Sequence, residues 1–325
     1  MVTSERLAEM RARKALTVAG VGDRPLTRLE SATNEVWAAG DVVVRVNRRT
    51  QARLRREATI AAALPPEVRY PEVLAAGAEA GEDWLVQRRV AGTPLVRCWP
   101  ALTVEERRRA VGEVAAALRA LHATAEPAGA PPAGEPPQLL QPGAHATDPV
   151  CAALGRAAAL PHVDAGALRD AVGWVRTIRA ALDPFDAPTL VHGDLHFQNV
   201  LWDGDHVSAL LDLEFARTSP PDLDLDVLLR FCVVPFLYVP VGREAEARAE
   251  DYADVPFWFR DAYPELFAHR RLLDRLRLYA VGFDVHDLLA NPPTRPVSEL
   301  TRHHPYRRLL ATLRGQGHLD YLAAL

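Results

Sequence analysis

The sequence predicts an α+β protein with two lobes: a small antiparallel β lobe that contains one helix, followed by a larger, mainly helical lobe. Short segments of alternating apolar residues, separated by turn residues, fill the first part of the chain, whereas long helical patterns dominate the rest. A Gly-Thr-Pro run at residues 92–94 ends the last strand pattern and marks the hinge. Since 325 residues suffice for two separate cores, we expect the lobes to comprise residues 1–91 and 92–325.

The first lobe is expected to contain five strands, at residues 26–29, 35–39, 42–46, 73–76 and 84–89. Thr50 can cap a helix over residues 51–64, which the Pro65-Pro66 pair ends. Residues 4–16 form a weakly amphipathic helical pattern, which we expect at the periphery of the lobe.

In the second lobe, Thr103 opens a long helical pattern. Residues 126–149 are rich in Pro, Ala and Gly and have little apolar periodicity, which predicts a mobile loop. Helical patterns resume over residues 152–160 and 165–182, and helices dominate again from residue 223 onward.

Composition and charge exclude several classes of protein. A hydrophobic content of 49%, a charged content of 25% and a net charge of −4 are typical of a soluble globular protein and argue against a nucleic-acid binder. Cys98, Cys151 and Cys232 are too widely spaced for a disulfide framework or a zinc site, which favours a reducing cytoplasm. The N-terminal residues do not resemble a secretory signal. The apolar run at residues 227–241 is interrupted by Arg and Pro and is too short to span a bilayer, so we expect no membrane partner.

The most informative segment lies at residues 191–201, Val-His-Gly-Asp-Leu-His-Phe-Gln-Asn-Val-Leu. It contains the pattern H-x-D-x-x-x-x-N, and Asp212 follows after one predicted hairpin. Phosphoryl transfer requires three such polar groups: Asp194 as the base that accepts the proton of a substrate hydroxyl, and Asn199 and Asp212 as oxygen ligands of Mg²⁺. An ordinary turn with solvated polar residues is the alternative, and the combination of all three groups with a hairpin disfavours it.

The predicted hairpin brings two of these groups together. Asp203-Gly204 lies between the apolar runs at residues 199–202 and 205–212, and an Asp-Gly pair in this setting is a strong signal for a tight turn. Asn199 begins the first strand and Asp212 ends the second. Antiparallel pairing is therefore expected to bring both candidate metal ligands to the same end of the hairpin.

A strand and the helix after it carry the candidate nucleotide site. Side chains alternate between the two faces of the strand at residues 42–46, so Val43 and Arg45 share a face. There the apolar side chain can pack on a base while the cation reaches its phosphates, and Glu57 on the helix can turn inward to pair with Arg45. The alternatives are an exposed Arg45 and a solvated pair between Arg53 and Glu57, four residues apart.

The loop between the first two strands supplies candidate phosphate donors. Its sequence, Ser31-Ala32-Thr33-Asn34, contains no glycine, but Ser31, Thr33 and Asn34 can donate hydrogen bonds to phosphate oxygens. Taken alone, the segment would be an ordinary turn. Its position ahead of the strand that bears Val43 and Arg45 favours the functional interpretation.

Together these segments resemble the aminoglycoside phosphotransferase and choline kinase group of protein-kinase-like small-molecule kinases. The resemblance covers about residues 25–230 and rests on Ser31-x-x-Asn34, Arg45-Val46, Arg56-Glu57, the H-G-D-L-H-x-x-N pattern and Asp212-x-Glu214.

The resemblance implies a two-lobed protein-kinase-like fold, ATP or GTP as phosphate donor, and Mg²⁺. It implies that Asp194 is the catalytic base and that Asn199 and Asp212 bind the metal. It also implies that backbone groups around Arg88 and Val90 meet the purine. Two residues depart from the usual pattern. Arg45 stands where Lys is usual, and Gln87 stands at the back of the base pocket where apolar residues are common, so the choice between ATP and GTP stays open.

The motif does not identify the acceptor. Acidic residues between positions 222 and 290 could bind a polycationic aminoglycoside, although solvated helix faces are the alternative, and the aromatic residues at 257–263 would equally suit a sugar, nucleoside or macrolide. Three hypotheses follow: an O-phosphotransferase acting on an antibiotic such as an aminoglycoside, a kinase of a primary metabolite such as a sugar, amino sugar or choline-like alcohol, and a catalytically silent nucleotide-binding module. The intact set of Asp194, Asn199 and Asp212 disfavours the third.

Overall fold

The computed structural model describes residues 4–22, 24–31, 34–47, 52–79, 82–141, 143–183, 189–240 and 242–319. The chain packs into two compact units. Unit 1 comprises Met1–Gly134, Thr189–Thr218 and Pro235–Tyr263, and unit 2 comprises Glu135–Pro188, Ser219–Val234 and Pro264–Leu325. This division reflects packing, whereas the boundary predicted at residue 91 separates functional lobes and stays a prediction.

Unit 1 contains a five-stranded antiparallel sheet with the strand order β1-β2-β3-β5-β4. Its strands are β1 (Thr27–Leu29), β2 (Glu35–Ala39), β3 (Val42–Asn47), β4 (Val73–Glu79) and β5 (Glu82–Arg88). All five predicted strands are present. In β3, Val42, Val44 and Val46 are buried on one face, while Arg45 points to the other, as strand alternation requires.

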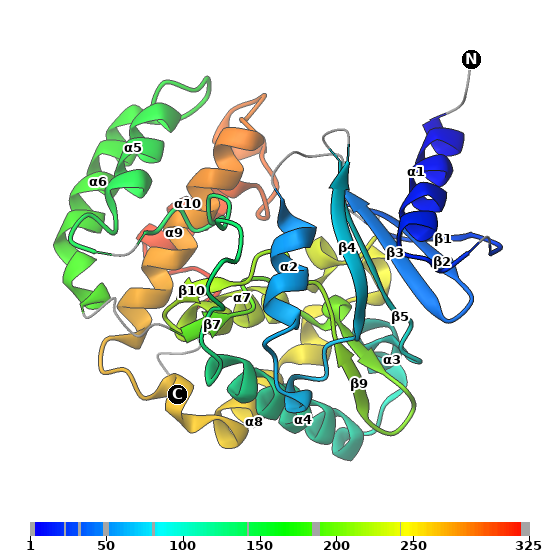
Figure 1. The fold of residues 1–325 in the computed structure, drawn as a ribbon. Helices are drawn as coiled ribbons and strands as arrows, with labels where there is room; N and C mark the ends of the chain where they lie inside the picture. Colours follow the sequence, from blue (N-terminus) through cyan, green and yellow to red (C-terminus); the bar gives the residue numbers. More distant parts are fainter. Residues whose placement is uncertain are drawn as a thin grey trace. The chain divides into compact units, whose positions relative to one another are not determined.

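Two helices cover opposite faces of this sheet, α1 (Ser4–Val18) and α2 (Arg53–Ala61) (Figure 1). Ala8, Ala12 and Leu16 of α1 pack on the valine face of β3. The prediction of a peripheral helix was therefore wrong, because alanines at helical spacing let α1 approach the strands closely. The predicted cap Thr50 lies outside the described residues.

The N-terminal end of α2 is instead satisfied from the sheet. The carboxylate of Asp83, on β5, accepts hydrogen bonds from the backbone N–H groups of Leu54 (2.6 Å) and Arg55 (3.3 Å). These are orphan donors of the first helical turn. A contact between segments far apart in sequence therefore sets where the helix begins.

The rest of unit 1 surrounds a short sheet with the order β6-β8-β9. Its elements are β6 (Thr93–Pro94), α3 (Leu95–Cys98), α4 (Val104–His122), β8 (Val200–Trp202), β9 (Val207–Leu210) and α8 (Val255–Ala262), and β7 (Thr189–Val191) pairs with β10 (Arg217–Ser219). Thr103 opens α4 as predicted, through a reciprocal capping box with Glu106.

The main elements of unit 2 are the helices α5 (Asp148–Ala157), α6 (Ala165–Ile178), α7 (Asp222–Val233), α9 (Leu272–Ala290) and α10 (Pro305–Leu313). The long helix α9 packs against α5, α7 and α10. Buried ion pairs join α7 to α9, with Arg275 Nε 2.5 Å from Asp222 Oδ2 and Arg230 Nη1 2.8 Å from Asp284 Oδ1.

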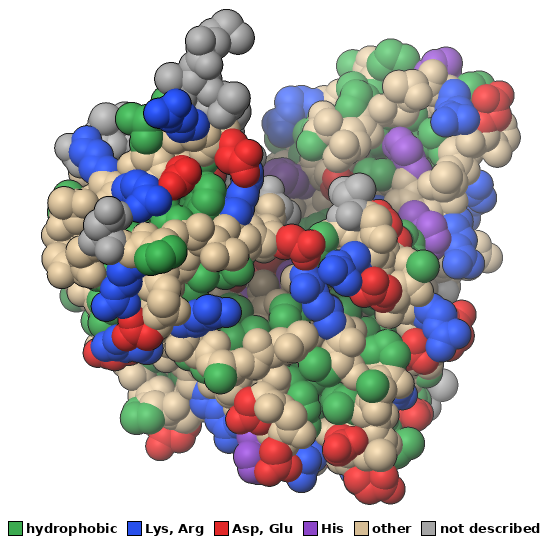
Figure 2. Space-filling view, turned by 90° about the vertical axis from the view of Figure 1, so that its right-hand side faces the viewer, with side chains coloured by type: hydrophobic (Ala, Val, Ile, Leu, Met, Phe, Trp, Pro, Cys, Tyr) green, Lys and Arg blue, Asp and Glu red, His purple; other side chains and the backbone are tan. Residues whose placement is uncertain are grey.

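Short 3-10 helices occur at Pro66–Val68, Trp99–Ala101, Arg179–Leu182, Phe197–Asn199, Pro235–Tyr238, Glu244–Glu246, Ala249–Tyr252, Pro264–Phe267 and Val297–Glu299. On the face of the molecule drawn in Figure 2, acidic and basic side chains are interspersed, in keeping with the small net charge of −4. Among the described residues, the helices are all too short or too polar to cross a membrane.

We expect Gly282→Ala to destabilise unit 2. A Cβ at this position of α9 would lie 1.8 Å from the backbone oxygen of Gln138, so the segment that contains Gln138 would have to move. The cost should be at least about 2 kcal/mol of unfolding free energy, measured by urea denaturation. Gly173→Ala in α6 is the matched control, because nothing lies within 4 Å of its Cβ and the exchange should stabilise the helix by about 0.5 kcal/mol. Equal effects at both positions would contradict this.

Candidate active site

Asp194 lies in the loop after β7, and its two neighbours on the N-terminal side hold that loop. Gly193 has a φ of +79°, and a Cβ there would lie 2.5 Å from the Phe215 carbonyl oxygen, so only glycine fits. The backbone N–H of Asp194 donates to His192 Nδ1 (3.3 Å). His192 Nε2 therefore carries the ring proton and donates to the Leu211 carbonyl (3.0 Å), so this side chain braces the loop that carries Asp194.

The predicted hairpin is present. The backbone N–H of Leu211 donates to the Asn199 carbonyl at 2.8 Å, so Asn199 and Asp212 lie at the same end of the hairpin, as expected. The turn spans residues 203–206, and the Asp203 carboxylate accepts the backbone N–H groups of Asp205 and His206. This Asx turn is longer than the two-residue turn expected from Asp-Gly.

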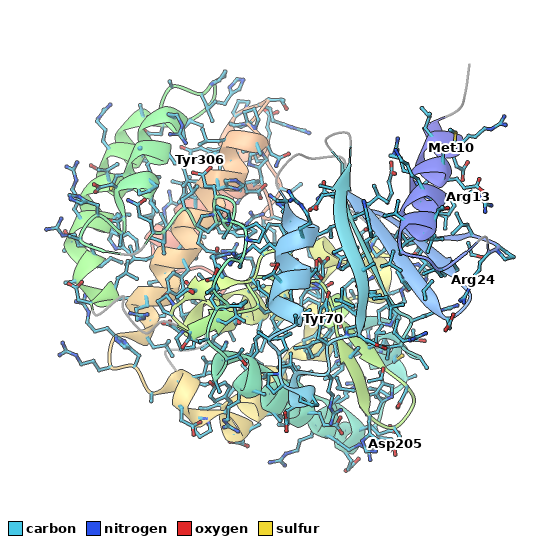
Figure 3. The ribbon with its side chains drawn as sticks, viewed as in Figure 1. Met10, Arg13, Arg24, Tyr70, Asp205 and Tyr306 are labelled. Carbon is cyan, nitrogen blue, oxygen red and sulfur yellow. The ribbon has the colours of Figure 1, made fainter. Side chains whose placement is uncertain are left out.

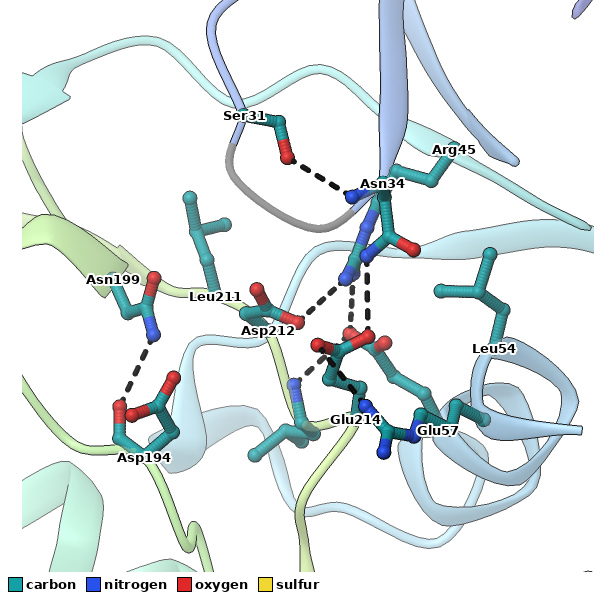
Figure 4. Close-up of polar contacts among 12 residues, drawn as sticks. Ser31, Asn34, Arg45, Leu54, Glu57, Asp194, Asn199, Leu211, Asp212 and Glu214 are labelled. Carbon is teal, nitrogen blue, oxygen red and sulfur yellow. Dashed lines mark hydrogen bonds and ion pairs between the residues drawn. The ribbon is translucent and has the colours of Figure 1, made fainter. Parts of the chain in front are cut away.

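The side chain of Asn199 is oriented by the loop that carries Asp194. Its Nδ2 donates to the Asp194 carbonyl (3.1 Å), and the amide oxygen lies on the opposite side (Figure 4). The Asp194 carboxylate is 31% exposed, and its Oδ2 lies 3.5 Å from His196 Nε2. Burial raises the pKa of Asp194, but the interactions with His196, His192 and Asn199 outweigh it and keep this pKa below its usual value. Asp194 is therefore an ionised acceptor at neutral pH.

Arg45 bridges two carboxylates. Its Nη1 donates to Glu57 Oε1 at 2.6 Å and its Nη2 to Asp212 Oδ1 at 2.5 Å. Burial lowers the pKa of Arg45, but the charges of Asp212 and Glu57 outweigh it and hold this pKa well above its ordinary value. The predicted Arg45–Glu57 pair is confirmed, and the two surface alternatives were wrong, because Arg45 is 7% exposed and Arg53 approaches Glu214 instead (4.0 Å).

One carboxylate oxygen of Glu57 accepts three hydrogen bonds. Besides Arg45, the Tyr70 hydroxyl (2.5 Å) and the backbone N–H of Leu213 (3.0 Å) donate to Glu57 Oε1. Tyr70, labelled beside α2 in Figure 3, was not found from the sequence, since it lies in an irregular segment with no pattern of its own. The Leu213 contact attaches α2 directly to the residue that follows Asp212.

Asp212 adopts a left-handed backbone conformation with a φ of +65°. This conformation costs a residue other than glycine of order 1–3 kcal/mol and persists only when its surroundings enforce it. Hydrogen bonds on both sides do so here: Leu211 N to Asn199 O precedes Asp212, and Leu213 N to Glu57 Oε1 follows it.

The oxygens of Asn199 and Asp212 fit a magnesium ion. Mg²⁺ prefers oxygen ligands and is commonly held by one or two protein groups together with water and substrate phosphates. In the described part of the chain, no group of three or more His, Cys, Asp or Glu residues could hold a metal. Asn199 and Asp212 could therefore supply two oxygen ligands to such an ion, with water and phosphate oxygens as the others.

The candidate base-binding residues follow the sheet. Val43 on β3 pairs with Gln87 on β5, so the two side chains share the face that carries Arg45. Gln87 is 6% exposed, and its Oε1 is buried without a hydrogen-bond partner among the described residues. Arg88 is exposed, pairs with Asp41 through its side chain and donates its backbone N–H to the Glu72 carbonyl. Val90 is half-buried just beyond the strand.

The candidate phosphate loop is only partly described, because Thr33 lies outside the described residues. Ser31 Oγ accepts the backbone N–H of Asn34 at 3.4 Å. Asn34 is buried, and its Nδ2 donates to Glu214 Oε2 at 3.2 Å. The structure thus directs the Asn34 amide towards Glu214, a contact that sequence reasoning missed.

The residues considered for acceptor binding are largely occupied. Asp222 and Asp284 form the buried arginine pairs of unit 2, and Asp251 pairs with Arg248. Of the aromatic residues, Phe259 is buried and the Tyr263 hydroxyl lies 3.0 Å from His122 Nδ1, whereas Phe257 is exposed. Most of these side chains therefore serve packing and ion pairing.

Comparison with known proteins places these features in a family. The model of a phosphotransferase enzyme family matches residues 26–266. None of the curated protein sequences compared with the chain matched it.

Solved structures with the same fold include several aminoglycoside phosphotransferases. The GDP complex of aminoglycoside 2'-phosphotransferase-IIIa is 16% identical, with a TM-score of 0.60 over 95% of this chain and 97% of that one. A ternary complex of a related phosphotransferase with streptomycin and ATP is 14% identical, with a TM-score of 0.58 over 95% and 99%. An aminoglycoside phosphotransferase from Streptomyces rimosus is 20% identical, with a TM-score of 0.54 over 86% and 98%.

Glu214 generates a prediction about pH. Burial and the nearby charge of Asp212 raise the pKa of Glu214 from 4.5 to about 7. Between these two values the folded chain holds a proton that the unfolded chain has lost, so the free energy of unfolding falls as pH rises through this window.

We expect Glu214→Gln, which keeps an oxygen for Asn34 but does not titrate, to be stabilising relative to the wild type at pH 8. The difference in unfolding free energy between Glu214→Gln and the wild type should be larger at pH 8 than at pH 5 by at least about 1 kcal/mol. It is measured by urea denaturation with a chelator present. Glu67→Gln, at an exposed carboxylate, is the matched control. The same difference at pH 5 and pH 8 would show that Glu214 is ionised throughout.

Proposed function

Because the chain belongs to the phosphotransferase enzyme family, we propose that it uses Mg²⁺ to transfer the γ-phosphate of ATP or GTP to a hydroxyl group of a small molecule. The protein is a small-molecule O-phosphotransferase of this family, and the metal, the nucleotide and the acceptor are what the proposal adds. The observation that carries it is the convergence of Asp194, Asn199 and Asp212 on the loop and hairpin beside the Arg45–Glu57 pair.

In this proposal Asp194 accepts the proton of the acceptor hydroxyl, whose oxygen attacks the γ-phosphorus. The bond from that phosphorus to the β–γ bridging oxygen breaks, and ADP or GDP leaves. Asn199 and Asp212 hold Mg²⁺, which neutralises charge on the phosphates when bound. Arg45, oriented by Glu57, contacts the phosphates, as do Ser31 and Asn34. Val43 and Gln87 meet the purine, with backbone groups of Arg88 and Val90 beside it.

Gln87 Oε1, which has no hydrogen-bond partner among the described residues, bears on the choice of nucleotide. An amide oxygen accepts a hydrogen bond from the exocyclic amine of adenine, whereas rotation of the amide would present its nitrogen to the carbonyl of guanine. Leaving a buried acceptor without a hydrogen bond costs free energy, and binding of either base would remove that cost. Both nucleotides therefore belong in the test.

An aminoglycoside or another antibiotic is the first acceptor class to test, because the structures of similar fold include complexes with streptomycin and hygromycin B. A primary metabolite such as a sugar, an amino sugar or a choline-like alcohol is the second, because arginine pairs already neutralise acidic residues that would attract a polycation. We assign the reaction to the cytoplasm, because the cell supplies the nucleotide there and the protein lacks a disulfide framework.

A nucleotide-consumption screen tests the function. ATP and GTP are each incubated with Mg²⁺ and aminoglycosides, other hydroxylated antibiotics, sugars or amino alcohols, beside resistance tests in a sensitive host. Acceptor-dependent release of ADP or GDP supports the proposal, and the acceptor that gives the highest kcat/KM decides between the two classes. A chain that binds Mg²⁺ and nucleotide but consumes it with none of these acceptors would instead favour a silent binding module.

We expect Asp194→Asn to lower kcat at least about 100-fold, because the amide cannot accept the hydroxyl proton. The Kd of the nucleotide, measured by calorimetry, should stay within about twofold, since Asp194 lies outside the nucleotide contacts. Undiminished turnover would reject Asp194 as the base.

We expect Asp212→Ala to abolish the Mg²⁺-dependent part of nucleotide binding, because it removes the only charged ligand in the proposed metal site. Calorimetric titrations with nucleotide, with and without Mg²⁺, should give the same Kd for this variant and different values for the wild type. Retained metal dependence would place the metal elsewhere.

A further inference from the structure

One face of α2 contacts four successive residues of the segment that follows Asp212. Arg53, Arg56 and Glu57 share this face because residues three and four positions apart are neighbours on a helix. The backbone N–H of Leu213 donates to Glu57 Oε1 (3.0 Å). Arg53 contacts the next two residues: its Nη1 lies 4.0 Å from Glu214 Oε1, and its guanidinium lies 4.8 Å from the centroid of the Phe215 ring. The Ala216 carbonyl then accepts a hydrogen bond from Arg56 Nε (3.0 Å).

Arg56 extends this contact to the Pro-rich stretch that the sequence analysis expected to be mobile. Its Nη1 donates to the Pro131 carbonyl (2.5 Å) and its Nη2 to Glu126 Oε1 (2.6 Å). Arg56 is 2% exposed, so all three of its contacts lie in a protein environment. A planar guanidinium with donors in fixed directions can hold three separate segments in one geometry.

Glu126 closes the arrangement on the far side of the same segment. Its Oε2 accepts the backbone N–H of Thr218 (3.0 Å) and the Thr218 hydroxyl (2.5 Å). Residues 213–218 are thereby attached at both ends, to α2 at Leu213 and to Glu126 at Thr218. Arg56 joins the two attachments.

This geometry matters because Asp212 needs support. Its left-handed backbone relaxes if the residues after it can move, and its carboxylate then leaves the position opposite Asn199. A buried guanidinium that loses its carboxylate partner would be left uncompensated, so α2 and the segment would shift together.

We propose that the buried Arg56 and the partly exposed Glu126 form a clasp that positions Asp212 for the metal, and that this is the role of the first part of the Pro-rich stretch. The clasp residues are positioning residues, since they act through the segment 213–218 and not on the substrate. The inference rests on the proposed function, because it assigns the clasp to the metal ligand named there.

The test is nucleotide binding by calorimetry with and without Mg²⁺, using ADP or GDP, whichever the wild type binds. Glu126→Gln removes the charge that pairs with Arg56, and Arg56→Lys cannot reach all three of its partners. Both should raise the Kd measured with Mg²⁺ at least about fivefold while the Kd without Mg²⁺ stays within about twofold. Thr218→Val, at the exposed edge of the clasp, should give a smaller change in the same direction.

Arg55→Gln is the matched control. Arg55 lies on the same helix but pairs with Asp83 on the sheet, so both Kd values should equal those of the wild type. The Tm is measured for every variant. A lower Tm with an unchanged ratio of the two Kd values in Glu126→Gln and Thr218→Val would overturn the inference and leave the clasp a purely structural contact. A wild-type chain that binds no nucleotide, or binds it without regard to Mg²⁺, would defeat the proposed function itself.

Discussion

The site depends on a single buried carboxylate oxygen. Glu57 Oε1 accepts hydrogen bonds from Arg45 on β3, from Tyr70 ahead of β4 and from the backbone of Leu213. A fully buried carboxylate is tolerated only when donors and charge replace the water it has lost. These three donors come from separate segments. If α2, the sheet or the residue after Asp212 moved independently, the buried carboxylate would lose a donor and become unfavourable.

The position of Asp212 follows from this constraint. The hairpin alone brings Asp212 beside Asn199, but it leaves the backbone of Asp212 free to choose its conformation. The left-handed φ of +65° is unfavourable for aspartate, and it is maintained by partners fixed elsewhere. Short-range structure thus places the residue, while long-range hydrogen bonds select the conformation in which its carboxylate meets Arg45.

The sequence predicted those parts of the site whose causes are local. The β3 alternation and the Asp-Gly turn act over a few residues, so the faces of Val43 and Arg45 and the meeting of Asn199 with Asp212 could be deduced from spacing. The pairing of Arg45 with Glu57 was within reach because both lie on adjacent elements. Asn34 to Glu214, by contrast, joins residues 180 positions apart, and no periodic pattern reports such a contact.

The same reason explains why the packing of α1 was misjudged and why the contacts of the Pro-rich loop could not be predicted. Helix α1 has only a weak apolar pattern, since alanine contributes little to it, yet small side chains are what allow close packing on β3. Residues 126–131 have a loop composition, and their order comes from the buried Arg56, which lies 70 positions before Glu126. Composition predicts the local preference of a segment, whereas the position of these two segments is determined by the residues that they contact.

The arginine at position 45 is explained by the geometry of its contacts. Nη1 and Nη2 of one planar group each reach a different carboxylate oxygen, at 2.6 and 2.5 Å. A lysine would offer both carboxylates a single nitrogen, which must approach two anions at one point, and its ammonium group is more strongly hydrated and loses more on burial. The fork therefore suits a site in which the helix carboxylate and the candidate metal ligand face the same cation, and the departure from lysine preserves the charge while fixing the distance between Glu57 and Asp212.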